Sequence, residues 1–98
     1  MTSTEETLAD LADEHLARLV AVPWESFAAD IERRGAHPSG ETTGLEVGGA
    51  YYDVSDSVRW ESSHGGDILL TIEAYTDPSF PPQRSVRRTA VIPRPAGA

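Results

Sequence analysis

The segment from Ile68 to Tyr75 constrains the fold of this chain most strongly, because apolar residues recur in it at every second position. One face of the segment carries Ile68, Leu70, Ile72 and Ala74, and the other carries Leu69, Thr71, Glu73 and Tyr75. A period of two with β-branched and aromatic residues is typical of a strand that buries one face. The sequence therefore predicts a β-strand here, with a core side and a mixed polar side.

The run before this strand alternates as well, and a turn separates the two. Its apolar positions are Tyr52, Val54, Val58 and Trp60. Asp56 and Ser57 interrupt the phase, which indicates either a β-bulge or a later start of the strand. The residues between the two runs, 62–67, include Gly65 and Gly66, which tolerate the positive φ angles of a hairpin connection. We therefore expect a β-hairpin centred on the glycine pair.

The N-terminal third of the chain predicts two helices within residues 4–35. Ser3 and Glu6 fit a capping box, and an apolar stripe with helical spacing follows: Leu8, Leu11, Ala12, His15, Leu16, Leu19 and Val20. Pro23 suits the first position of a second helix, whose apolar face is Trp24, Phe27, Ala28 and Ile31. Gly35 is a plausible stop for that helix.

The remaining segments complete an α+β fold in a single domain, residues 1–98. Residues 36–49 are rich in Gly, Ser and Thr and predict a loop, although Leu45 and Val47 leave room for a brief strand. A third main strand is expected within 84–92, and residues 93–98 are expected to form a flexible tail. We therefore predict two N-terminal helices packed on one face of a three- or four-stranded antiparallel meander, residues 50–92, whose strand order stays open.

Composition narrows the function classes. The 98 residues include no cysteine, which excludes disulfides and thiolate chemistry, and the formal net charge is −8. No apolar run approaches the roughly 18 residues of a membrane span, and the acidic start is unlike a signal peptide, so we expect a cytoplasmic protein. Acids dominate residues 1–75, whereas residues 76–98 carry one acid and four arginines. This balance disfavours nucleic-acid and membrane partners and favours a basic protein.

No motif in the chain predicts catalysis, a metal site or a cofactor site. The zinc, P-loop, dinucleotide and serine-nucleophile signatures are all missing from the sequence. An alternative to a protein-binding function is a small enzyme or small-molecule-binding domain, with a pocket between the helices and the sheet. Its lining would come from Trp24, Phe27, Tyr52 and Trp60. Its acid/base candidates are His15, on the apolar stripe, and His64, which lies between Glu61 and Asp67 in sequence.

Two surface features point to binding. The polar side of the strand, Leu69, Thr71, Glu73 and Tyr75, together with Arg59 on the preceding run, mixes the polar, aromatic and Arg character of protein interfaces. The prolines of 78–84 contain a PxxP pattern, which suits a stiff connector between strands or a polyproline II ligand. We expect the strand face to be the binding surface.

Trp60-Glu61, followed by His64-Gly65-Gly66-Asp67-Ile68 and a strand ending in Ile72-Glu73, resembles a group of small uncharacterised bacterial proteins. In these, helices precede a meander with a Trp and a Gly-Gly-Asp-Ile type of turn. The stretch also looks, more loosely, like compact acidic immunity proteins that neutralise bacterial toxins. The resemblance covers about residues 60–74 and supplies no catalytic residue, and the basic C-terminal segment departs from the immunity pattern.

These observations lead to a non-enzymatic protein-binding domain as the first hypothesis. Its concrete forms are an immunity-type or antitoxin-like inhibitor, or an accessory subunit. The acidic body would speed association with a basic partner, and Arg59 and Tyr75 would serve as anchors. An exposed sheet face or edge would equally serve a homodimer.

Overall fold

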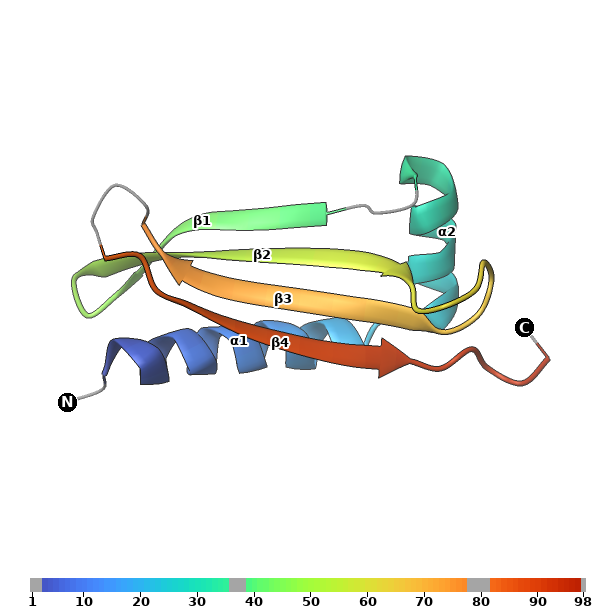
Figure 1. The fold of residues 1–98 in the computed structure, drawn as a ribbon, viewed down its shortest axis with the longest axis horizontal. Helices are drawn as coiled ribbons and strands as arrows, with labels where there is room; N and C mark the ends of the chain where they lie inside the picture. Colours follow the sequence, from blue (N-terminus) through green and yellow to red (C-terminus); the bar gives the residue numbers. More distant parts are fainter. Residues whose placement is uncertain (1–2, 36–38, 78–81, 98) are drawn as a thin grey trace.

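The computed structural model describes residues 3–35, 39–77 and 82–97. Two helices precede four strands, as Figure 1 shows: α1 (Thr4–Val20), α2 (Trp24–Arg34), β1 (Ser39–Val47), β2 (Ala50–Trp60), β3 (Ile68–Thr76) and β4 (Ser85–Ile92). The strands form one antiparallel sheet in the order β1-β2-β3-β4. The predicted α+β class and the antiparallel meander are confirmed.

Helix α1 begins at the predicted cap and lies along β3 and β4. The Ser3 hydroxyl oxygen accepts a hydrogen bond from the backbone N–H of Glu6 at 3.1 Å, which satisfies one of the free donors of the first turn. Leu8 and Ala12 are fully buried in a cluster that includes Val54 and Ile72. The apolar stripe therefore faces the sheet, as its helical spacing predicts.

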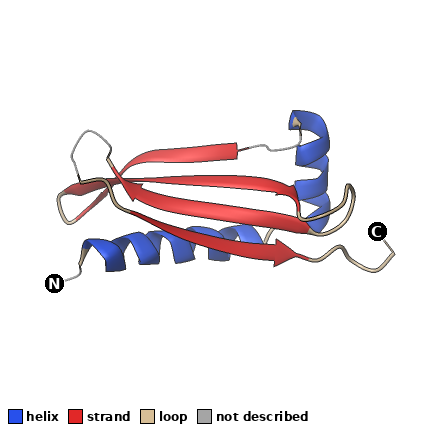
Figure 2. Ribbon diagram, viewed as in Figure 1, coloured by secondary structure: helices blue, strands red, loops and turns tan. Residues whose placement is uncertain are grey.

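Helix α2 crosses the end of the sheet and covers the same face as α1 (Figure 1). Pro23 occupies the position just before its first residue, where a missing N–H leaves no hydrogen bond unmade. Phe27 and Ile31 are buried against Val58 and Leu70. Both helices therefore pack on one side, and Figure 2 shows no described helix on the side that faces the viewer.

Strand β2 runs through Asp56 without a break in its pairing with β3. Asp56 lies on the helix-covered face opposite Ile72, and its carboxylate meets His15 of α1. The bulge or late strand start expected at this point is therefore wrong, because the polar residue keeps the strand phase and finds its partner on the helix. The irregularity of the sheet lies instead in β1, between Thr42 and Leu45.

Residues 36–49, predicted as a loop, contribute the nine-residue edge strand β1. Only Leu45 in this strand is partly buried, so neither face supplies an alternating apolar pattern. Backbone hydrogen bonds to β2 stabilise the strand instead. Such bonds do not depend on which side chains the strand carries, so the sequence pattern does not reveal them. Gly44 has a φ of 69° at the irregularity, and its N–H donates to Asp53 Oδ1 at 3.0 Å.

The expected flexible tail begins with two anchoring contacts. The backbone N–H of Arg94 donates to Asp67 Oδ1 at 2.9 Å, and its guanidinium lies 5.7 Å from the centre of the Trp24 ring. Residues 93–97 are nevertheless exposed. The PxxP pattern falls on residues 78–81 and lies outside the described residues.

Candidate binding face

The five residues predicted to bind a partner share the face of the sheet that the helices leave open. In the β2–β3 register, Arg59 pairs with Leu69, and Thr71, Glu73 and Tyr75 follow at alternate positions of β3. The core residues Leu70, Ile72 and Ala74 point the opposite way and are fully buried. We call this surface the open face, and it includes the outward residues of all four strands (Figure 2).

The open face is organised in rows that run across the strands. Their members are Arg59, Leu69 and Val91 in the first row; Ser39, Ser57, Thr71 and Thr89 in the second; Glu41, Ser55, Glu73 and Arg87 in the third; and Asp53, Tyr75 and Ser85 in the fourth. Short hydroxyl side chains fill the second row. The two ends differ, because one carries a cation beside apolar side chains and the other an aromatic phenol among carboxylates.

Tyr75 is fixed at the carboxylate-rich end of the open face. Its hydroxyl donates to Glu41 Oε1 at 2.7 Å across two strands. This hydrogen bond, then burial, then the negative charges of Glu41, Asp53 and Glu73 raise the pKa of Tyr75 from 10.0 to about 12. The phenol is therefore neutral at physiological pH and presents a held aromatic ring to a partner.

Arg59 differs from the other open-face arginine in having no side-chain partner among the residues that the structure describes. Arg87 lies 3.6 Å from Glu73, whereas Arg59 is exposed and makes no ion pair or hydrogen bond with a side chain in the described part of the chain. Beside it, Leu69 is partly buried and Val91 is 49% exposed. An unpaired guanidinium next to exposed apolar surface is the composition of an interface anchor.

Sequence reasoning missed two contributors to the open face. Glu41 was hidden because its segment was read as a loop, although its pairing with Ser55 brings it within reach of Tyr75. Val91 falls at the outward position opposite Leu69. The alternation within 84–92 was the available signal, since it places Val91 on the side of the strand opposite to Ala90 and Ile92.

The two alternative acid/base histidines occupy separate places, and each has one carboxylate partner. His15 Nε2 lies 2.9 Å from Asp56 Oδ2 between α1 and β2, with side chains that are only 15% and 24% exposed. His64 pairs with Glu32 of α2 and not with Glu61 or Asp67, between which it lies in the sequence. Both pairs join a helix to the sheet layer. Among the described residues, no three potential ligands gather in a way that would hold a metal ion.

The aromatic residues expected to line one pocket are distributed over the molecule instead. Tyr52 and Phe27 belong to different core clusters. A hollow of about 570 Å³ lies at the β1–β2 turn and the start of α1, and Tyr51 and Tyr52 line it. Trp24 and Trp60 are at the opposite end, next to α2. The hollow contains neither of the two candidate histidines.

Comparison with known proteins yields no match: no family model, no curated protein and no solved structure corresponds to this chain. The helices of the described residues also include none with the length and apolar character needed to cross a bilayer.

Proposed function

We propose that the protein is a non-enzymatic protein-binding domain that engages its partner through the open face. The observation that carries the proposal is the one-sided packing of both helices, which leaves the outward residues of the sheet accessible. Arg59, Leu69 and Val91 supply a cation and apolar contact area at one end of that face. Tyr75 supplies a hydrogen-bonded ring at the other end. Arg and Tyr are among the residue types that dominate binding energy in protein interfaces.

The partner that best fits this surface is a basic protein. The chain carries a formal net charge of −8, and the carboxylates of Glu41, Asp53 and Glu73 gather around Tyr75 on the open face. Such a field speeds the approach of a positively charged protein and loses its effect as salt is added. An immunity-type or antitoxin-like inhibitor, or an accessory subunit, is the concrete role that we propose.

Quantitative affinity capture from the source cell tests this function with three baits. The first is the unchanged protein, and the second is an open-face variant that combines Arg59→Gln, Leu69→Thr, Glu73→Gln and Tyr75→Thr. These changes conserve net charge and keep residues that tolerate strands. We expect a stoichiometric basic protein to be retained by the unchanged bait and lost from the variant.

The third bait is a matched control with four changes on exposed helix positions: Glu14→Gln, Ala17→Ser, Arg18→Gln and Ala29→Ser. It alters the same number of residues with the same zero change in net charge, and it should retain the partner. Equal retention by the open-face variant would remove the basis of the proposal. A homodimer seen by light scattering, and dissolved by the open-face changes, would instead assign this face to self-association.

The competing function is small-molecule binding, and the hollow beside Tyr51 and Tyr52 is the observation that favours it. This alternative predicts that a metabolite raises the melting temperature of the isolated protein. An enzyme that used His15 or His64 as an acid or base, at a site apart from this hollow, would lose turnover in His15→Gln or His64→Gln. A protein-binding domain would keep its partner in both variants.

A further inference from the structure

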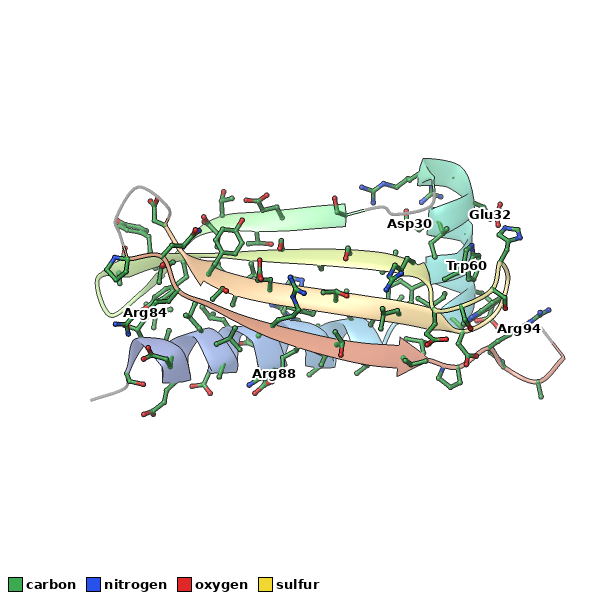
Figure 3. The ribbon with its side chains drawn as sticks, in the orientation of Figure 1. Asp30, Glu32, Trp60, Arg84, Arg88 and Arg94 are labelled. Atoms are coloured by element: carbon green, nitrogen blue, oxygen red, sulfur yellow. The ribbon has the colours of Figure 1, made fainter. Side chains whose placement is uncertain are left out.

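A second hollow, of about 260 Å³, lies between the end of α2 and the β2–β3 connection, away from the open face. Its lining combines one apolar, one aromatic, one acidic and one imidazole side chain with a glycine: Ile31, Trp60, Glu32, His64 and Gly35. Figure 3 shows Trp60 and Glu32 on this side of α2. We call this feature the α2 cleft.

The aromatic wall of the α2 cleft is held in place by its neighbours. The Trp60 ring centre lies 6.1 Å from that of Trp24 and 5.4 Å from that of His64, which meets it edge-on. Trp24 is itself fixed, because its indole N–H donates to the Gly66 carbonyl oxygen at 2.9 Å. Trp60 is therefore a preorganised π surface that retains partial exposure.

Two sources of negative charge border the α2 cleft, a carboxylate and a helix C-terminus, and the Arg94 guanidinium lies nearby over Trp24. Glu32 uses one carboxylate oxygen, Oε1, in its contact with His64, and Oε2 has no partner among the described residues. The cleft also adjoins the C-terminal end of α2, where the helix dipole places partial negative charge. The arginines of this last turn are engaged elsewhere: both contact Asp30, and Arg34 also donates to the Ser39 carbonyl oxygen.

We propose that the α2 cleft binds an organic cation, a guanidinium or alkylammonium group. An aromatic face, a carboxylate with a free oxygen and a helix C-terminus each attract positive charge, and here all three border one hollow. The cation would lie over the Trp60 ring and donate to Glu32 Oε2. This site involves no residue of the open face, so its test is independent of the proposed function.

NMR titration of the 15N-labelled protein tests the site with N-acetyl-arginine amide, and with N-acetyl-citrulline amide as the neutral isostere. The Trp60 indole N–H and the Gly35 amide report on the cleft, and the Glu73 amide reports on the open face. We expect saturable shifts at Trp60 and Gly35 with the arginine probe, and none at Glu73. An equal response to citrulline, or no saturable response to arginine, overturns the proposal.

Two isosteric variants distinguish a local effect of the Glu32 carboxylate on cation binding from an effect of the net charge of the protein. Glu32→Gln should weaken binding of the arginine probe by about tenfold or more, because a charge-assisted hydrogen bond is lost. Glu25→Gln removes the same charge from an exposed position in the first turn of α2 and should leave the affinity within about twofold. Equal weakening by both variants would overturn the specific role of Glu32.

A further titration, with a Gly-Ser-Arg-Ser-Gly peptide, distinguishes a cation on a polypeptide from a free small cation. Tighter binding of the peptide than of the arginine derivative would assign the cleft to a basic side chain of a polypeptide. Equal affinity would assign it to a free small cation. Both results support the cation site, and they separate its two occupants.

Discussion

Arg88 of β4 donates from Nε to Asp13 Oδ1 of α1 at 2.9 Å, and Arg84, one residue before β4, pairs with Glu5 of α1. The two pairs fit because eight residues of helix and four residues of strand both rise about 12–13 Å. Figure 3 shows Arg84 and Arg88 along this seam. The positive charge of the C-terminal segment is therefore partly neutralised by the N-terminal helix, which leaves the acidic charge elsewhere to dominate the surface.

A double-mutant cycle on this seam should give a small and salt-sensitive coupling. Asp13→Asn and Arg88→Gln, alone and together, are expected to yield a coupling free energy of about 0.2–1 kcal/mol, because both side chains are substantially exposed. Urea denaturation at low and high salt measures it. A coupling that is unchanged by high salt would contradict the assignment as a screened surface pair.

The His15–Asp56 pair should contribute more, since it lies between α1 and β2 with little exposure. We expect His15→Leu to lower the free energy of unfolding by about 1–3 kcal/mol, because it leaves the Asp56 carboxylate without its partner. Adding Asp56→Val should recover most of the loss, since an apolar pair removes the unsatisfied group. Urea denaturation of both variants checks this, and a double variant that is no more stable than the single one would refute it.

Tyr75 predicts a stability change at high pH. Its folded-state pKa of about 12 exceeds the ordinary value of 10.0, so the folded protein binds more protons between these values. Its contribution is therefore complete below pH 10 and is lost as the pH rises toward 12. We expect urea midpoints of the unchanged protein to fall more steeply across this window than those of Tyr75→Phe.

The same hydrogen bond can be tested from its acceptor side. Glu41→Gln removes the carboxylate whose hydrogen bond is the largest cause of the shift, together with its charge, and should return the pKa of Tyr75 toward 10.0. Phenolate absorbance during an alkaline titration measures this change. Tyr51→Phe is the control, because it removes another tyrosine signal without touching the Glu41 contact.

Gly44 should be sensitive to any side chain. Its φ of 69° lies in the left-handed region, and a Cβ added at this position would meet open space, so backbone strain alone decides the outcome. Gly44→Ala is expected to cost about 1 kcal/mol, and Gly44→Asn less, because Asn tolerates this region better. Urea midpoints rank the two variants, and an alanine variant as stable as the original would contradict the assignment.

Sequence patterns could predict those elements in which burial and local capping coincide. The Ser3 cap with its apolar stripe marked α1, and the alternation around Leu70 marked the central hairpin. In place of β1 the sequence indicated at most a brief strand at Leu45 and Val47, because an edge strand with two exposed faces is specified by backbone pairing, which side-chain character does not record. Missing this strand also concealed Glu41, the hydrogen-bond partner of Tyr75.

The predicted binding residues fell on one face because a period of two fixes which side chains share a side of a strand. Pairings between distant segments could not be foreseen in this way. In the sequence, Asp56 interrupts the apolar alternation of its strand. Its partner His15 lies on α1, 41 residues earlier. The carboxylate partner of His64 is likewise distant in the sequence, since Glu32 lies on α2, 32 residues away.

The seam between α1 and β4 also dictates an order of events during synthesis. Strands that are neighbours in the sheet are also consecutive in the sequence. Each pair can therefore form as soon as its second strand has been synthesised. Helix α1 precedes all four strands in the sequence and packs mainly against the last two of them, β3 and β4. Its apolar stripe therefore stays exposed to other chains and to chaperones until β4 has been synthesised. A truncation before Ser85 should accordingly yield an aggregating product, although three of the four strands are complete.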